Sequence, residues 1–176
     1  MELRDERILL REWRVEDVPA IEAACQDPEI SHWIPFVPRP YSRSDAETYV
    51  RECLASDAGR HPFAITDVET GALLGSIDMG VNSFGYRGHI GYWVVAEARG
   101  RGVCSGALRL LADWALEELR LQRLELITDP DNAASQRVAE KVGFRREGVL
   151  RSHLRHPDGR LRDSVMYSLL PGELVR

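Results

Sequence analysis

Two arginines and two glycines alternate in the segment Arg99-Gly100-Arg101-Gly102. A β-patterned run at 89–95 precedes them, and apolar residues at helical spacing follow from 103 to 119. Glycine lets the backbone adopt unusual φ angles and approach a ligand closely, and a helix N-terminus offers unpaired N–H groups and a partial positive charge. Arginine adds charge-assisted contacts. The pattern therefore predicts an anion site, of which a pyrophosphate is the simplest occupant.

Glycines at this spacing also occur in nucleotide loops and in plain turns. The segment lacks the Gly-x-x-x-x-Gly-Lys-Ser/Thr pattern of a nucleotide P-loop, and a dinucleotide fingerprint would need a third glycine where Ser105 stands. Asp129 could imitate the ribose-binding acid of a Rossmann unit, but antiparallel runs before the loop do not suit a doubly wound sheet. Glycines also serve strand-to-helix turns for steric reasons alone. The loop by itself does not decide between these possibilities.

Hydrophobic periodicity along the chain predicts alternating strands and helices in the order βααβββαβαββ. Ser44 and Glu47 have the spacing of a capping box and predict a helix to about Ala55. Asn132 is a natural N-cap and Gly143 a natural C-terminal stop for a later helix. The proline-rich stretch 33–41 predicts a packed loop near a pocket. The strands are expected at 8–13, 63–68, 73–79, 89–95, 123–128 and 165–169, the last following a hairpin turn at 157–159, and the other helices at 18–25 and 103–119.

Composition restricts the class of protein. The 176 residues suit one domain, with 44% hydrophobic and 29% charged residues, and no apolar run approaches the roughly 20 residues of a membrane span. The first seven residues mix charges and lack the apolar core of a signal peptide, so we expect a cytoplasmic protein without a membrane partner. Cys25, Cys53 and Cys104 show no Cys-x-x-Cys spacing or matching histidine cluster, which predicts neither disulfides nor a metal site.

The charge distribution is uneven. The net charge of -5 argues against a nucleic-acid binder. The C-terminal region is nevertheless rich in arginine, which favours either a solvated hairpin face or a rim for an anionic partner. These arginines are Arg145, Arg146, Arg151, Arg155, Arg160 and Arg162.

Three motifs together resemble the GNAT (GCN5-related N-acetyltransferase) superfamily. Its signature Arg/Gln-x-x-Gly-x-Gly/Ala is met by Arg99-x-x-Gly102-x-Cys104, which departs only at its last position. Ile90-Gly91-Tyr92-Trp93 precedes the loop; Asn132-x-x-Ser135 and then 140–144 and 147–148 follow it, and together they are similar to the ribosomal-protein-alanine N-acetyltransferase (RimJ/RimL) branch. The similarity extends from Leu10 to about Leu170. It implies one domain over 1–176 with an α/β fold of the α+β type, whose mixed, mostly antiparallel sheet has about seven strands with helices on both faces.

The same resemblance implies acetyl-coenzyme A as the acyl donor. Two central strands are expected to splay apart around the pantetheine arm, with the N–H of Val95 polarising the thioester carbonyl as a one-donor oxyanion hole. An ordinary structural role remains open for Asn132 and Ser135 as helix-cap residues. The expected cofactor contacts are Trp93, Val94, Val95, Arg99, Gly100, Arg101, Gly102, Val103, Cys104, Ser105, Asn132, Ser135 and Lys141.

Proton transfer requires a base and an acid. An α-amino group titrates near ~8 and must lose its proton before attack. His89 stands where relatives often carry glutamate and is the first candidate base, with Glu125 and Tyr167 as reserves and a role as a plain strand residue left open. Many relatives protonate the leaving thiolate with a tyrosine at the position of Ala139, so the resemblance assigns that step to Ser135.

Two further features bear on the chemistry. Cys104 at a helix N-terminus could act as a nucleophile, but a small buried cysteine also satisfies the motif without reacting. The acceptor pocket is expected to involve Trp33, Phe36, Tyr41 and Tyr92, although aromatic residues in such a loop also serve as core plugs.

The resulting hypothesis is direct transfer of acetyl to a primary amine in a ternary complex, with a protein N-terminal α-amine as the first expectation. A small-molecule acceptor such as a polyamine, an aminoglycoside or an amino acid is the alternative. A non-catalytic acyl-coenzyme A sensor that uses the arginine-rich hairpin is another, and a homodimer is left open.

Overall fold

The computed structural model describes residues 1–57 and 59–175. In this part of the chain no helix combines the length and hydropathy that a membrane span requires. The strands are β1 (Glu2–Arg4), β2 (Ile8–Arg11), β3 (Arg60–Asp67), β4 (Leu73–Val81), β5 (Arg87–Val94), β6 (Arg123–Thr128), β7 (Arg145–Arg155) and β8 (Leu161–Leu169), and the α-helices are α1 (Val18–Ala24), α2 (Pro28–Trp33), α3 (Arg43–Leu54), α4 (Val103–Glu117) and α5 (Ala133–Val142).

The strands form one sheet in the order β1-β2-β3-β4-β5-β6-β8-β7. All neighbours pair antiparallel except β5 and β6, which are parallel. The mixed, mostly antiparallel sheet is thus confirmed. It has one strand more than expected, because β1 pairs its three residues with β2 and is too short and too charged to show a β pattern.

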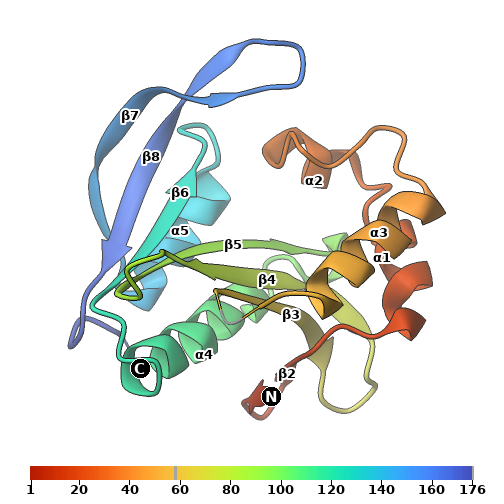
Figure 1. The fold of residues 1–176 in the computed structure, drawn as a ribbon, viewed down its shortest axis with the longest axis horizontal. Coiled ribbons are helices and arrows are strands. Elements are labelled where there is room, and N and C mark those ends of the chain that lie inside the picture. Colours follow the sequence, from red (N-terminus) through yellow and green to blue (C-terminus); the bar gives the residue numbers. More distant parts are fainter. Residues whose placement is uncertain (58, 176) are drawn as a thin grey trace.

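Helices cover both faces of the sheet, as expected (Figure 1). In β3, Ile65 packs in the core that includes α4, whereas the neighbouring Ala64 packs against α1 and α3. Successive side chains of a strand point to opposite faces, so β3 is buried on both sides. The two cores hold α4 and α5 on one face and α1 and α3 on the other.

Two helix starts differ from the sequence expectation. The N-cap of α3 is Ser42, whose Oγ accepts from Asp45 N at 3.2 Å while Asp45 Oδ2 accepts from Ser42 N at 2.8 Å. The capping box expected at Ser44 and Glu47 is therefore wrong by two residues. Helix α2 was not expected, yet Asp27 caps it by accepting from Glu29 N at 2.9 Å, and Pro28 occupies its first turn, where a missing N–H costs nothing.

Candidate functional site

The central strands β5 and β6 pair only over the first half of β5. Their register runs from Arg87↔Arg123 to Ile90↔Leu126, although β5 continues to Val94 and β6 to Thr128. The two strands therefore separate towards their carboxyl ends, and β5 presents an open edge within the sheet. An extended ligand that offers carbonyl and amide groups can pair with such an edge.

The hydrogen-bond alternation of β5 decides which backbone groups face this gap. Asn82 N–H donates to Arg87 O and Val95 N–H donates to Leu74 O, each at 2.9 Å. In an antiparallel ladder these bonds recur at every second residue, so the odd-numbered residues of β5 bond to β4. The N–H groups of Tyr92 and Val94 consequently point into the gap. The expectation that Val95 supplies the oxyanion-hole donor is wrong, because its N–H already serves the sheet.

The glycine loop after β5 has the backbone that its sequence predicts. Gly100 and Gly102 have φ of 71° and 80°, and Gly102 is the N-cap of α4. The first helical bond joins Gly106 N–H to Gly102 O at 2.9 Å, which leaves the preceding N–H groups available to an anion. Ser105, by contrast, turns its hydroxyl back to donate to Gly102 O at 3.0 Å.

A cation that sequence reasoning missed lies at this loop. A Cβ built on Gly102 would lie 3.6 Å from Arg7 Nη2, and Arg7 Nη1 donates to Arg101 O at 3.4 Å. Arg7 is 94 residues away in sequence and belongs to no motif, so only the folded chain shows it beside the N-terminus of α4. The site thus combines helix N–H groups with a guanidinium that can swing onto a phosphate.

The two arginines of the loop lie in different surroundings. Arg99 forms ion pairs with Asp27 at 2.5 Å and Glu29 at 2.7 Å, and its guanidinium also donates to Val94 O at 3.3 Å. The backbone hydrogen bond from Glu29 and the contact with Arg99 lower the pKa of Asp27. Arg99 therefore fastens α2 to the loop. Arg101 is exposed and lies outside the cavity lining, so its predicted cofactor contact has no support from this geometry.

A cavity of about 940 Å³ occupies the space between the separated strands, α5 and the loop after α2. Most of the expected site residues line it. They are Trp33, Phe36, His89, Tyr92, Trp93, Val94, Arg99, Gly100, Gly102, Val103, Cys104, Ser105, Asn132, Ser135 and Lys141. Tyr41 does not line it: the side chain is buried with Trp13 and Val50 in the core under α1 and α3, and burial raises its pKa. The prediction that Tyr41 contacts the acceptor is wrong, because this aromatic ring is a core plug.

Two hydroxyls meet across the opened strands. Tyr92 on β5 and Ser135 on α5 have their hydroxyl oxygens 3.0 Å apart. Asn132 caps α5 by accepting from the backbone N–H of Ser135 at 3.0 Å, which leaves the serine hydroxyl free for the tyrosine. Burial raises the pKa of Tyr92, so the phenol keeps its proton. The pair can donate a proton into the cavity and share the resulting charge.

A second histidine faces the same cavity as His89. The side chain of His89 is exposed, yet desolvation by the surrounding protein lowers its pKa and outweighs the opposing effect of the Glu125 carboxylate. His153 lines the cavity and has its Nδ1 3.2 Å from Ser164 Oγ. Two imidazole rings are therefore accessible from the cavity.

His153 reaches the cavity through a backbone irregularity that the sequence conceals. The β7–β8 register shifts between Leu150 and Leu154, and Ser152 has a φ of 50°. Such bulges change the direction of side chains near active sites. No glycine occurs at this bulge, so the sequence of the segment is typical of an ordinary strand.

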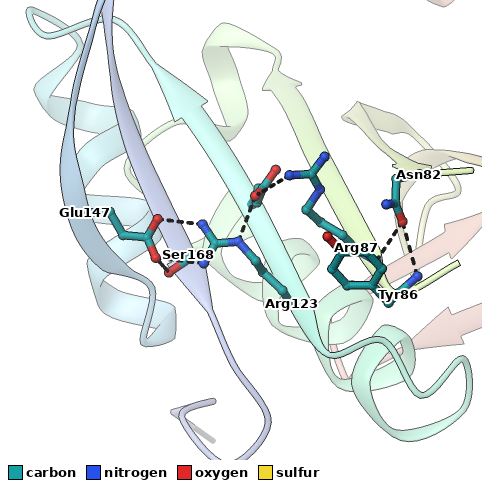
Figure 2. A network of polar contacts seen from close by, with 7 residues as sticks. Asn82, Tyr86, Arg87, Arg123, Glu147 and Ser168 are labelled. Carbon is teal, nitrogen blue, oxygen red and sulfur yellow. Dashed lines mark hydrogen bonds and ion pairs between the residues drawn. The ribbon is translucent and has the colours of Figure 1, made fainter. Parts of the chain in front are cut away.

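The reserve bases are occupied elsewhere. Figure 2 shows a row of polar residues across β5, β6, β8 and β7. Glu125 accepts from Arg123 at 2.7 Å and Arg87 at 3.4 Å, and Arg123 also pairs with Glu147 at 2.5 Å. Tyr167 is fully buried and donates to Glu140 at 3.0 Å. Neither Glu125 nor Tyr167 lines the cavity, so neither fits as a base there.

Cys104 lines the cavity, and burial raises the pKa of its thiol. A thiol that keeps its proton is a poor nucleophile, so the position is better explained as a small residue against the ligand. Among residues 1–57 and 59–175 no group of three or more histidine, cysteine, aspartate or glutamate side chains could hold a metal ion.

Comparisons with known proteins agree with the geometry. The family model described as "Acetyltransferase (GNAT) domain" matches residues 7–145. The Bacillus subtilis protein named "Putative ribosomal N-acetyltransferase YdaF" is 33% identical over 150 residues, which cover 82% of this chain and 79% of that protein. The structure of Mycobacterium smegmatis RimJ in complex with CoA-disulfide superimposes on this chain with a TM-score of 0.84 at 25% sequence identity. The match covers 100% of this chain and 88% of the RimJ chain. An acetyltransferase of the GNAT family from Bacillus anthracis is 24% identical in sequence and has the same fold, with a TM-score of 0.87. The match covers 97% of this chain and 98% of that protein's chain.

Proposed function

The chain belongs to the GNAT family of N-acetyltransferases, and from that premise we propose that it passes acetyl from acetyl-coenzyme A directly to the α-amine of a protein N-terminus. The observation that carries the proposal is the separation of β5 and β6 beside the N-terminus of α4. It combines an open strand edge and an anion site in one cavity.

The residues of the donor side fit coenzyme A. The left-handed Gly102, the free N–H groups of α4 and the Arg7 guanidinium would hold the pyrophosphate. The N–H groups of Tyr92 and Val94 would pair with the pantetheine arm and offer hydrogen bonds to the thioester carbonyl. Bound there, the thioester supplies an activated acetyl group, and we propose that no metal takes part.

The two histidines provide the base. An ammonium cannot attack a carbonyl, so the acceptor amine must first give up a proton. Because burial lowers the pKa of His89, its ring is neutral at pH 7 and can accept that proton. His153 faces the same cavity and can serve as a second acceptor. An α-amine titrates near ~8, which makes it an easier partner for a histidine than a lysine at ~10.4.

The hydroxyl pair provides the acid. Once the amine has attacked, the sulfur leaves as a thiolate and needs a proton. Ser135 Oγ can donate it and recover a proton from solvent, while the Tyr92 hydroxyl, 3.0 Å away, holds the serine oxygen by a hydrogen bond. The amine, the base and the acid then share one cavity, which supports direct attack in a ternary complex.

The protein acceptor is supported by the relatives' names. One is named a ribosomal N-acetyltransferase and another is RimJ. We place the reaction in the cytoplasm, which is consistent with the three free thiols of Cys25, Cys53 and Cys104.

An acceptor screen tests the proposal. Release of free thiol from acetyl-coenzyme A is measured with peptides that carry a free N-terminus, with the same peptides N-terminally blocked, and with polyamines, aminoglycosides and amino acids. Turnover on the free peptides that blocking abolishes is the expected result. Turnover on small amines alone would show that the acceptor is a small molecule and not a protein N-terminus. Binding of the donor without turnover on any amine would favour an acyl-coenzyme A sensor.

A further inference from the structure

A second cavity, of about 820 Å³, adjoins the first. It lies between the loop after α2 and the tip of the β7–β8 hairpin, which curls towards α2 in Figure 1. The two cavities have several lining residues in common, so they meet along one boundary. The shared residues are Pro35, Phe36, Val37, Asp129 and Arg162.

This second cavity is basic, although the whole chain carries a net charge of -5. Three arginines line it, Arg39, Arg160 and Arg162, whereas Asp129 is the one carboxylate among its described lining residues. Arg162 pairs with Asp129. Two further arginines therefore remain in excess at the rim of the acceptor side.

The arginines are not neutralised by other strong partners. Arg39 donates to the Ser31 hydroxyl and the Pro28 carbonyl, and none of the ion pairs among residues 1–57 and 59–175 involves it. Arg160 pairs at 2.7 Å with Asp158, but both side chains are exposed and such a pair contributes only about 0–1 kcal/mol. Both guanidiniums can therefore exchange their present contacts for a ligand carboxylate.

The most informative atom is Arg162 Nε. This atom is buried and has no hydrogen-bond partner among the described residues. The residue lines both cavities. A buried N–H without a partner costs free energy, and a ligand acceptor would remove that cost once the side chain turned this N–H towards the cavity. Arg162 itself stands at the junction that an acceptor chain would cross.

The remaining lining suits a peptide. Phe36 is 67% exposed and stands in both cavities, with Pro35, Pro38 and Pro157 nearby. Apolar walls with a few placed polar groups are typical of ligand pockets of this size. The cavity, of about 820 Å³, is larger than a single carboxylate group needs, and its size suits a short peptide segment.

We propose that the second cavity is an acceptor subsite that binds Asp or Glu side chains following the reacting N-terminus. The inference rests on the proposed function and specifies its substrate class as peptides with an acidic N-terminal segment. The amine lies by His89 and His153, the chain crosses Phe36 and Arg162, and the downstream carboxylates meet Arg39 and Arg160.

The test compares two peptides that share their first residue and differ in the next five, which carry Asp and Glu in one and Asn and Gln in the other. Binding of C-terminally labelled peptide to the coenzyme A-loaded protein is followed by fluorescence anisotropy, and kcat/KM by thiol release. We expect about 10-fold tighter binding and higher kcat/KM for the acidic peptide, as two charge-assisted contacts would give, falling with added salt.

The variant Arg39→Gln/Arg160→Gln should reduce the preference to about twofold or less. Arg151→Gln, which removes an exposed β7 arginine outside both cavities, should leave it unchanged. Equal binding of the two peptides to the unmodified protein, or an undiminished preference in the double variant, would overturn the inference. So would stronger competition by free glutamate than by the acidic peptide.

The two readouts separate the failures. Turnover on peptides without an acidic preference refutes the subsite and leaves the proposed function standing. An acidic preference in binding without turnover on any amine refutes the proposed function and supports the subsite.

Discussion

The proposed donor side and the proposed acceptor side of the cavity are built from different chemical groups. On the donor side the functional groups are largely backbone N–H groups, at Tyr92, Val94 and the first turn of α4, held by left-handed glycines. On the acceptor side they are side chains from α2, its following loop and the β7–β8 hairpin, which lie more than 100 residues apart in the sequence. Backbone geometry tolerates few sequences and therefore leaves a motif, whereas a side-chain cavity can be built in many ways and leaves none.

The largest expected effect breaks the donor side alone. Gly102→Glu forces a side chain onto a φ of 80° and places a negative charge at the N-terminus of α4. Together these should weaken coenzyme A binding on the order of 100-fold or more, measured by calorimetry. Gly80→Glu adds the same charge on β4, where a Cβ meets nothing within 4 Å, and should bind normally. Unchanged affinity in Gly102→Glu would refute the anion site.

The next effect lies where the two sides meet. His89→Gln should lower kcat about 10- to 100-fold at pH 7 while leaving coenzyme A affinity unchanged. Because the pKa of His89 is lowered, the acid limb of the unmodified protein's kcat profile should lie below pH 6.5. In His89→Gln, activity should recover as the pH rises, because the acceptor amine then loses its proton to solvent before it binds. If His153→Gln has the larger effect, the roles of the two histidines are reversed.

A smaller effect separates chemistry from capping on α5. Ser135→Ala should lower kcat about 10-fold, since a thiol with a pKa of ~8.5 still leaves unaided at modest cost. The melting temperature should fall only slightly, because the cap uses the backbone N–H of Ser135 and only the hydrogen bond with the Tyr92 hydroxyl is lost. Asn132→Ala should do the reverse and cost about 1 kcal/mol of stability. A full-rate Ser135→Ala enzyme would remove serine from the acid role.

The smallest effect concerns the polar row of Figure 2, which joins β6 to the hairpin. Hydrogen bonds from Arg123 and Ser168 lower the pKa of Glu147 from 4.5 to about 2. This carboxylate therefore stabilises the fold above about pH 4.5, and its contribution is lost as the pH falls towards 2. Because Glu147 is well exposed, Glu147→Gln should lower the melting temperature by only about 1–3 °C at pH 7, with the difference shrinking below pH 4.5. A difference that is independent of pH would show that the ion pair does not contribute.

Sequence reasoning succeeded where local chemistry fixes structure. Gly102 and Gly143 both take the left-handed conformations that their positions require, and Asn132 caps α5 as expected. The turn at Pro157 to Gly159 closes the last hairpin, with Gly159 at a φ of 87°. Each of these features depends on one residue and its immediate neighbours.

It failed where tertiary contacts choose between local alternatives. Val95 and Val94 are indistinguishable by type, and only the pairing of Leu74 with Val95 shows which N–H is free. Tyr41 lies in a segment that looked like a pocket loop, but its ring packs under α1. Arg7 and His153 enter the site from distant segments, whereas Arg162 belongs to the arginine-rich region that the sequence offered as a rim for an anionic partner. No pattern within a single window of sequence could have brought them together.

The incomplete pairing of β5 and β6 also bears on how long the protein survives. A donor bound between the separated strands would form hydrogen bonds with the open edge of β5. Because only the folded protein offers this edge, the free energy of unfolding should rise with the donor concentration. At 100 times its dissociation constant a ligand adds about 2.7 kcal/mol to the free energy of unfolding. Proteases attack the unfolded chain, and the proposed site therefore predicts that the molecule persists longest in cells that are well supplied with coenzyme A and its acyl esters.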